Sequence, residues 1–203
     1  MRLSEVRIKN YRLLIDAKLD VDAKTTLIVG RNNTAKTSCS SCINTVLQGS
    51  DFSYNDYPLS KREGLHNLFL QFMEKKLSYE DLCKKIETIS IEFLVDYSLD
   101  DPDAKLGALS PFIIDVDVDT TTALICVEYQ LKTDENKLRE LFKDSCYSEG
   151  QFDPNAEEMH DVLVRNFTKL FGLTIYAVNP KNLGQHRTEN CVQKMSLRGK
   201  IKT

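Results

Sequence analysis

This sequence lacks the features that mark membrane proteins, secreted proteins and proteins that bind nucleic acid through a basic surface. No apolar run approaches the ~18 residues of a membrane-spanning helix, so no membrane span is expected. The N-terminus lacks the apolar core and small-residue cleavage site of a secretory signal, which predicts a cytoplasmic protein. The net charge of −3 gives no basic excess. Because domains that bind nucleic acid alone usually carry a basic face, we expect any DNA contact to be local or made through other regions.

The cysteines and histidines form no metal-binding or catalytic motif. Cys39 and Cys42 make a C-x-x-C pair, but no second pair or histidine pair completes a zinc set. Their helical spacing predicts a packing role as reduced, buried thiols. The histidines at positions 66, 160 and 186 lie far apart in sequence, and nothing pairs them with a nucleophile. Neither residue type therefore predicts an active site.

Alternating Asp and Val at residues 115–119 could suggest a calcium loop. No glycine follows at residue 120, and the last position of such a loop is Cys126 rather than glutamate. The period of two is better explained by a strand with one solvent-facing side.

Hydrophobic periodicity predicts an α/β protein. Alternating residues predict strands over 2–9 and 14–21, which we expect to pair as a hairpin. The continuous apolar run Thr25–Val29 predicts a strand buried on both faces. Helices are expected from Lys36 to about Gly49, over 64–76, from Ser78, over 134–142 and over 156–171. Further strands are expected over 89–97, 113–118, 123–131 and 173–178. Residues 50–87 are interpreted as a helical insertion.

A glycine-containing loop joins the expected buried strand to the first expected helix. Gly30-Arg-Asn-Asn-Thr-Ala-Lys-Thr37 fits the phosphate-binding pattern G-x-x-x-x-G-K-[ST] except at Ala35. In such loops, backbone N–H groups and the helix N-terminus surround the phosphates. The lysine reaches the β- and γ-phosphates, and the following hydroxyl binds Mg²⁺. The residues expected to hold ATP are Gly30, Arg31, Asn32, Asn33, Thr34, Ala35, Lys36, Thr37 and Ser38, with Thr37 on Mg²⁺.

The alanine at position 35 leaves three interpretations open. If the position needs a positive φ, its methyl group costs about 1 kcal/mol. ATP binding can then survive in weakened form while hydrolysis is lost. The loop would belong to an ATPase, or to a nucleotide-sensing pseudo-ATPase module that binds without turnover. The third interpretation is an interaction domain whose loop is a polar connection with a solvated lysine.

Two sequence blocks together resemble a known group of ATPases. Leu3-x-x-Val-Arg-Ile-Lys-Asn-Tyr-Arg12, followed by Thr25–Ser38, is similar to the N-terminus of RecF-like and SMC-like ATPases, and most of all to OLD-family ATP-dependent endonucleases. The resemblance is specific over residues 1–48. The matching positions are Ile8, Asn10, Tyr11 and Arg12 in the first block and Gly30, Asn32, Asn33, Lys36 and Thr37 in the second.

This resemblance implies a fold and a mode of action. It implies that residues 1–180 form the N-terminal lobe of an ABC-type P-loop NTPase head, with an antiparallel subsheet supplied by strands between Ile89 and Leu131. It implies that Arg12 lies near the nucleotide, the alternative being a surface arginine that ends an edge strand. It also implies homo-oligomers formed through the ATPase heads, and ATP-driven DNA handling or cleavage in DNA repair or phage defence.

Several parts of such an ATPase are not found in this chain. There is no L-S-G-G signature and no apolar strand ending in Asp-Glu, since Tyr97 follows Leu94-Val95-Asp96. No toprim-type nuclease motif appears. Residues 181–203 form a basic tail without a closing element. We therefore expect the chain to be the first half of a composite site in a longer protein, and not to hydrolyse ATP or cleave DNA by itself.

Overall fold

An antiparallel sheet dominates the computed structural model, which describes residues 1–31, 35–97, 107–114, 121–182 and 192–193. The sheet has six strands in the order β2-β1-β3-β4-β7-β8, and every neighbouring pair is antiparallel. The strands are β1 (Arg2–Tyr11), β2 (Leu14–Asp20), β3 (Ile89–Asp96), β4 (Thr122–Leu131), β7 (Phe171–Val178) and β8 (Val192–Gln193). The sequence predictions of strands over 2–9, 14–21, 89–97, 123–131 and 173–178 are thus confirmed, as is the hairpin.

The first hairpin turns sharply at Arg12 and Leu13, since Tyr11 pairs with Leu14. Arg12 takes a positive φ of 50° there. Val6 and Ile8 of β1 point into the core with 1% of their surface exposed. Their alternation with polar neighbours is the period-two pattern of a strand with one buried face.

The predicted buried strand over Thr25–Val29 is wrong. The segment has no regular secondary structure, and Leu27 and Val29 are 80% and 77% exposed. A strand buried on both faces needs strands beside it and helices on both sides. Among the described residues, the sheet is wholly antiparallel and its edge strand β2 pairs only with β1. The apolar sequence therefore has nothing here to pack between.

Every helix except α2 begins within one residue of its predicted start. They are α1 (Lys36–Leu47), α2 (Leu59–Met73), α3 (Tyr79–Lys85), α4 (Glu135–Cys146) and α5 (Ala156–Leu170), with 3₁₀ turns η1 (Tyr54–Asp56), η2 (Gly107–Phe112) and η3 (Pro180–Asn182). Helix α2 starts at Leu59 rather than residue 64, and α4 continues past Phe142 to Cys146. Side chains of Ser78, Asp134 and Asn155 cap α3, α4 and α5, as these residue types do at helix starts.

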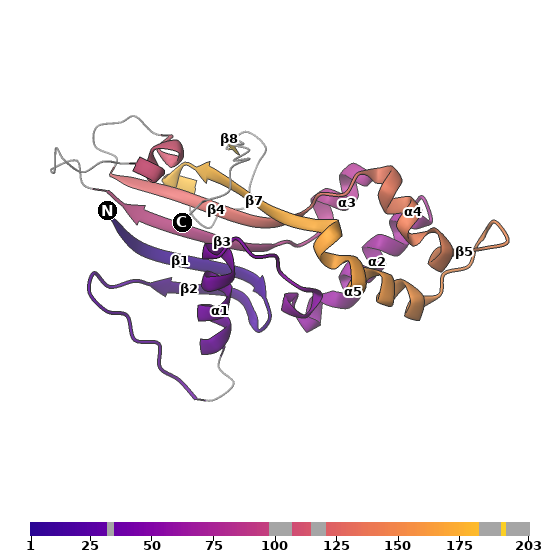
Figure 1. Ribbon diagram of the computed structural model, residues 1–203, viewed down its shortest axis with the longest axis horizontal. Coiled ribbons are helices and arrows are strands. Elements are labelled where there is room, and N and C mark those ends of the chain that lie inside the picture. The colour runs from indigo at the N-terminus through magenta and orange to yellow at the C-terminus, as the bar shows by residue number, and fades with distance from the viewer. Residues whose placement is uncertain (32–34, 98–106, 115–120, 183–191, 194–203) are drawn as a thin grey trace.

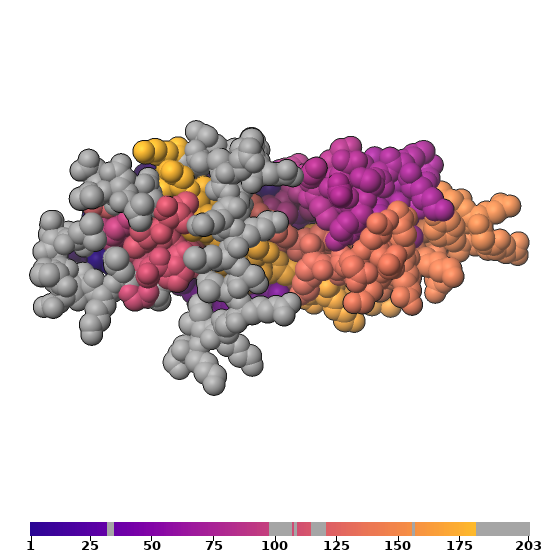
Figure 2. All heavy atoms as spheres, turned by 90° about the horizontal axis from the view of Figure 1, so that it is seen from above, coloured from indigo at the N-terminus to yellow at the C-terminus, as the bar shows by residue number. Residues whose placement is uncertain are grey.

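Helices α2 to α5 gather at one end of the sheet, and α1 lies against the β1–β2 hairpin (Figure 1). We call the group α2–α5 the helical lobe. One continuous core joins it to the sheet: Phe69 of α2 lies 5.3 Å from Phe142 of α4, and Tyr129 of β4 stacks on Phe171 at 6.0 Å between ring centroids. The molecule is elongated, with the lobe at one end, as Figure 2 shows.

Three sequence features fall partly or wholly outside this description. Residues 113 and 114 of the expected strand 113–118 are not in a strand, and the rest of it lies outside the described residues, as does the Asp/Val run 115–119. Most of the tail 181–203 is also outside them. A short hairpin, β5 (Tyr147–Ser148) with β6 (Gln151–Phe152), was not predicted. No helix in the described part of the chain is long and apolar enough to cross a membrane.

Candidate functional site

The glycine-containing loop ends at the start of α1, as the sequence predicts. Gly30 and Arg31 are exposed and non-helical, Ala35 is the residue before the helix, and Lys36 is its first residue. Asn32, Asn33 and Thr34 lie outside the described residues. The first turn of α1 contains no acidic residue. Because free N–H groups at a helix start carry partial positive charge, this end of α1 attracts anions.

Lys36 turns its amine back over the loop. Its Nζ donates hydrogen bonds to the carbonyl oxygens of Gly30 and of Arg31, the latter at 2.8 Å. The positive charge is thereby held beside the loop backbone instead of extending into solvent. A cation at this position, next to a helix N-terminus, is what the binding of a phosphate chain requires.

Ala35 has the left-handed conformation, with φ 63° and ψ 12°. Glycine adopts this conformation without cost, whereas for an L-residue it costs roughly 1–2 kcal/mol. Residue 35 therefore has a backbone conformation that glycine would adopt without strain.

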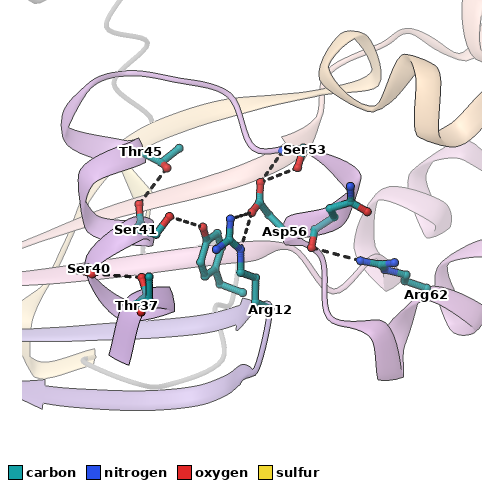
Figure 3. A network of polar contacts seen from close by, with 10 residues as sticks. Arg12, Thr37, Ser40, Ser41, Thr45, Ser53, Asp56 and Arg62 are labelled. Atoms are coloured by element: carbon teal, nitrogen blue, oxygen red, sulfur yellow. Dashed lines mark hydrogen bonds and ion pairs between the residues drawn. The ribbon is translucent and has the colours of Figure 1, made fainter. Parts of the chain in front are cut away.

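Thr37 and Ser38 follow in the first turn of α1. Thr37 is exposed, whereas Ser38 is buried with 8% of its surface accessible. Figure 3 shows Thr37 on the first turn, where its carbonyl oxygen accepts a hydrogen bond from Ser40 Oγ at 3.1 Å. Its exposed hydroxyl group is available as an oxygen ligand, the kind that Mg²⁺ prefers.

A pocket of about 160 Å³ opens between the β1–β2 hairpin and the start of α1. Ala35 and Lys36 form its loop side, and Ile28 lines it from the exposed segment before the loop. The remaining lining is mostly apolar: Val6, Ile8, Leu14, Ala17, Lys18, Leu19 and Cys39. An apolar pocket with a few polar groups at one end is the usual form of a small-molecule site.

Arg12 is engaged elsewhere. Its guanidinium binds the Asp56 carboxylate at 2.8 Å, and its backbone N–H donates to the Asp56 carbonyl oxygen at 2.7 Å. Asp56 also accepts hydrogen bonds from the N–H and hydroxyl of Ser53 (Figure 3). Burial alone raises the pKa of Asp56, but the bonds from Ser53 and Arg12 outweigh it and hold that pKa below its usual value. We call Arg12, Ser53 and Asp56 the turn clamp.

Sequence reasoning missed the turn clamp because its members are far apart in the chain. The one local signal was Ser53 followed by Asp56, an acidic form of the capping box. Tyr11, next to the clamp, links β1 to α1 through a 3.1 Å contact between its hydroxyl and that of Ser41. The clamp therefore holds the hairpin turn against η1, and Tyr11 holds the end of β1 against the helix that follows the loop.

The C-x-x-C pair lies inside the core. Cys39 is 9% exposed and Cys42 is fully buried, and both are free thiols. Burial raises the pKa of Cys42 to about 12, so it stays protonated at neutral pH. Both thiols therefore serve to pack α1 against the sheet.

Asp96 ends β3, where the sequence offered a weak match to the acidic strand end of P-loop ATPases. Its carboxylate binds Arg2 at 3.1 Å and Ser4 at 3.3 Å, across the β1–β3 pair. Asp96 therefore joins β3 to β1 within the antiparallel sheet.

Comparison with known protein families also indicates an ATPase. The sequence matches the AAA ATPase domain family over residues 1–190, and the chain belongs to that family. Membership indicates a nucleotide-binding ATPase, a class that uses ATP and Mg²⁺. No curated protein matches the chain.

Proposed function

We propose that this chain binds Mg²⁺-ATP through Gly30–Ser38, as the N-terminal part of an ATPase head. The observation that carries the proposal is the arrangement of Lys36, whose amine lies over the loop carbonyls at the start of α1. Thr37 supplies the hydroxyl for Mg²⁺ from the same turn. Membership of the AAA ATPase domain family supports this assignment independently of the geometry.

The pocket beside the loop suggests where the rest of the nucleotide lies. It is bounded by Ala35 and Lys36 on one side and by the hairpin on the other, and its lining is mostly apolar. With its phosphates at the loop and its base against the apolar face of the hairpin, ATP would lie across the start of α1. Arg12 remains a candidate for contact with the nucleotide only if it leaves Asp56 on binding.

The finer proposal is a RecF/SMC-like head of the OLD-family kind, in which the site is completed by further strands and by a second head. The exposed segment before the loop supports it, since Leu27 and Val29 carry a strand-like apolar sequence with 80% and 77% of their surface accessible. Such a sequence is suited to lie between parallel strands. DNA processing, with a role in DNA repair or phage defence, follows by analogy with that group.

Calorimetric titration of Mg²⁺-ATP into the 203-residue chain tests the binding proposal. We expect saturable binding that Lys36→Ala abolishes. Lys143→Ala, which removes an exposed lysine from α4, is the matched control and should bind as the parent does. Equal binding by Lys36→Ala and the parent would refute the role of the loop.

A second candidate, a nucleotide-sensing pseudo-ATPase, is favoured by the left-handed Ala35. A methyl group where backbone must approach phosphate can permit binding and misplace the γ-phosphate. Hydrolysis assays on a protein that contains the complete head separate the two candidates. Turnover with Ala35 in place identifies an ATPase, whereas turnover only after Ala35→Gly identifies a sensing module.

A further inference from the structure

Two histidines from distant parts of the chain meet in the helical lobe. His66 lies on α2 and His160 on α5, and Nε2 of His66 is 3.3 Å from Nδ1 of His160. The two ring centroids are 5.1 Å apart, with 44° between the ring planes. Figure 1 shows α2 and α5 together in the lobe, with α1 on the hairpin outside it. The pair takes no part in the candidate nucleotide site.

The separation of the two nitrogens matches that of two ligands on one metal ion. Zinc–nitrogen bonds of about 2.0–2.1 Å at the tetrahedral angle place the nitrogens about 3.3–3.4 Å apart. Two rings bound in that way have centroids about 5.2 Å apart, whereas a straight N–H···N hydrogen bond of 3.3 Å needs about 5.6 Å. The observed 5.1 Å is close to the separation expected for two ligands of one ion.

We propose that His66 and His160 form a site for a divalent transition-metal ion, of which zinc is the representative, and that the ion joins α2 to α5. Neutral imidazole is a preferred ligand of zinc, copper and nickel. No group of three or more His, Cys, Asp or Glu in the described part of the chain forms a metal cluster. The described residues thus supply two ligands, and water would complete the coordination of the ion.

The surroundings keep the pair in place. The ring edge of the buried Tyr54 packs against His160 at 5.4 Å between ring centroids, and its hydroxyl hydrogen-bonds Nε2 of His66 at 3.0 Å. A metal ion on Nε2 would take the place of this hydrogen bond.

Zinc titration of the whole chain, without nucleotide, tests the proposal. Because Cys83 is an exposed free thiol, every variant carries Cys83→Ser. We expect one zinc ion per chain by calorimetry and a rise in the unfolding temperature with zinc. His66→Gln and His160→Gln should each weaken zinc binding at least about tenfold, because one imidazole cannot retain the ion alone.

His186→Gln makes the same chemical change in the third histidine of the chain and is the matched control. Its zinc affinity should equal that of the parent. His160 is exposed, so His160→Gln keeps the fold, which its far-ultraviolet circular dichroism verifies. Absence of zinc binding in the parent overturns the proposal, and so does equal binding in the parent and in both pair variants. Neither result depends on whether the loop binds ATP.

Discussion

Replacing Ala35 by glycine isolates the strain in the loop. The left-handed conformation of Ala35, φ 63°, costs roughly 1–2 kcal/mol relative to glycine. Glycine adds freedom to the unfolded chain, which costs about 0.4–1 kcal/mol, and the half-buried methyl group is worth about 0.3 kcal/mol. The net expectation is a gain in the free energy of unfolding of about 0.5 kcal/mol.

Ala17→Gly is the matched control, because it removes a methyl group from the same pocket at a residue without positive φ. The entropy and methyl contributions are common to both variants, so Ala17→Gly should be destabilised by about 1 kcal/mol. The difference between the two variants is then the conformational cost itself, about 1–2 kcal/mol.

Thermal or urea unfolding of both variants measures that difference. For a chain of this length, it corresponds to unfolding midpoints that differ by about 2–8 °C. If Ala35→Gly is no more stable than Ala17→Gly, residue 35 does not hold a left-handed conformation and the strain argued for the loop does not exist. The same variant should bind Mg²⁺-ATP more tightly than the parent, since the strained methyl group no longer stands beside the phosphates.

Three further predictions concern other parts of the molecule. Asp56→Asn should lower the free energy of unfolding by about 1–2 kcal/mol at pH 7, a value already discounted for the exposure of Arg12. The folded-state pKa of Asp56 is lowered, so its contribution is full above the unfolded pKa of about 4 and disappears as the pH falls through the lower folded-state pKa. The urea midpoints of variant and parent should therefore converge as the pH is lowered below about 4. Leu27→Asn should change the free energy of unfolding by less than about 0.5 kcal/mol, because this leucine is 80% exposed. If urea unfolding instead shows a loss as large as that for a core leucine, Leu27 is buried and the predicted strand over Thr25–Val29 is correct. Thiol-reagent labelling followed by mass spectrometry should modify the exposed Cys83 in the native chain and leave the fully buried Cys42 unmodified until the protein unfolds, and rapid native labelling of Cys42 would contradict the packing of α1.

Sequence periodicity was reliable where a strand or helix has one buried face. The alternation in residues 2–9 and 123–131 reports which side chains face the core, and the structure confirms both strands. Helix starts were also readable, because Ser78 and Asp134 cap their helices through purely local hydrogen bonds. Local chemistry of this kind needs no knowledge of distant parts of the chain.

The same reasoning failed at Thr25–Val29, where the sequence is typical of a buried strand and the segment is exposed. A continuous apolar run records only that the residues suit burial, and says nothing about whether partner strands are present. Strand pairing is a property of the whole sheet, and here the described strands form an antiparallel sheet that ends at β2.

The sequence by itself determined the glycine-containing loop, the lysine at its end and the helix that follows, because these depend on neighbours within a few residues. Only the tertiary structure decided which distant side chains meet. Arg12 binds Asp56, and His66 faces His160 across 94 residues of chain. Such contacts arise from the packing of helices and strands around a shared core, and residue spacing along the chain carries no record of them.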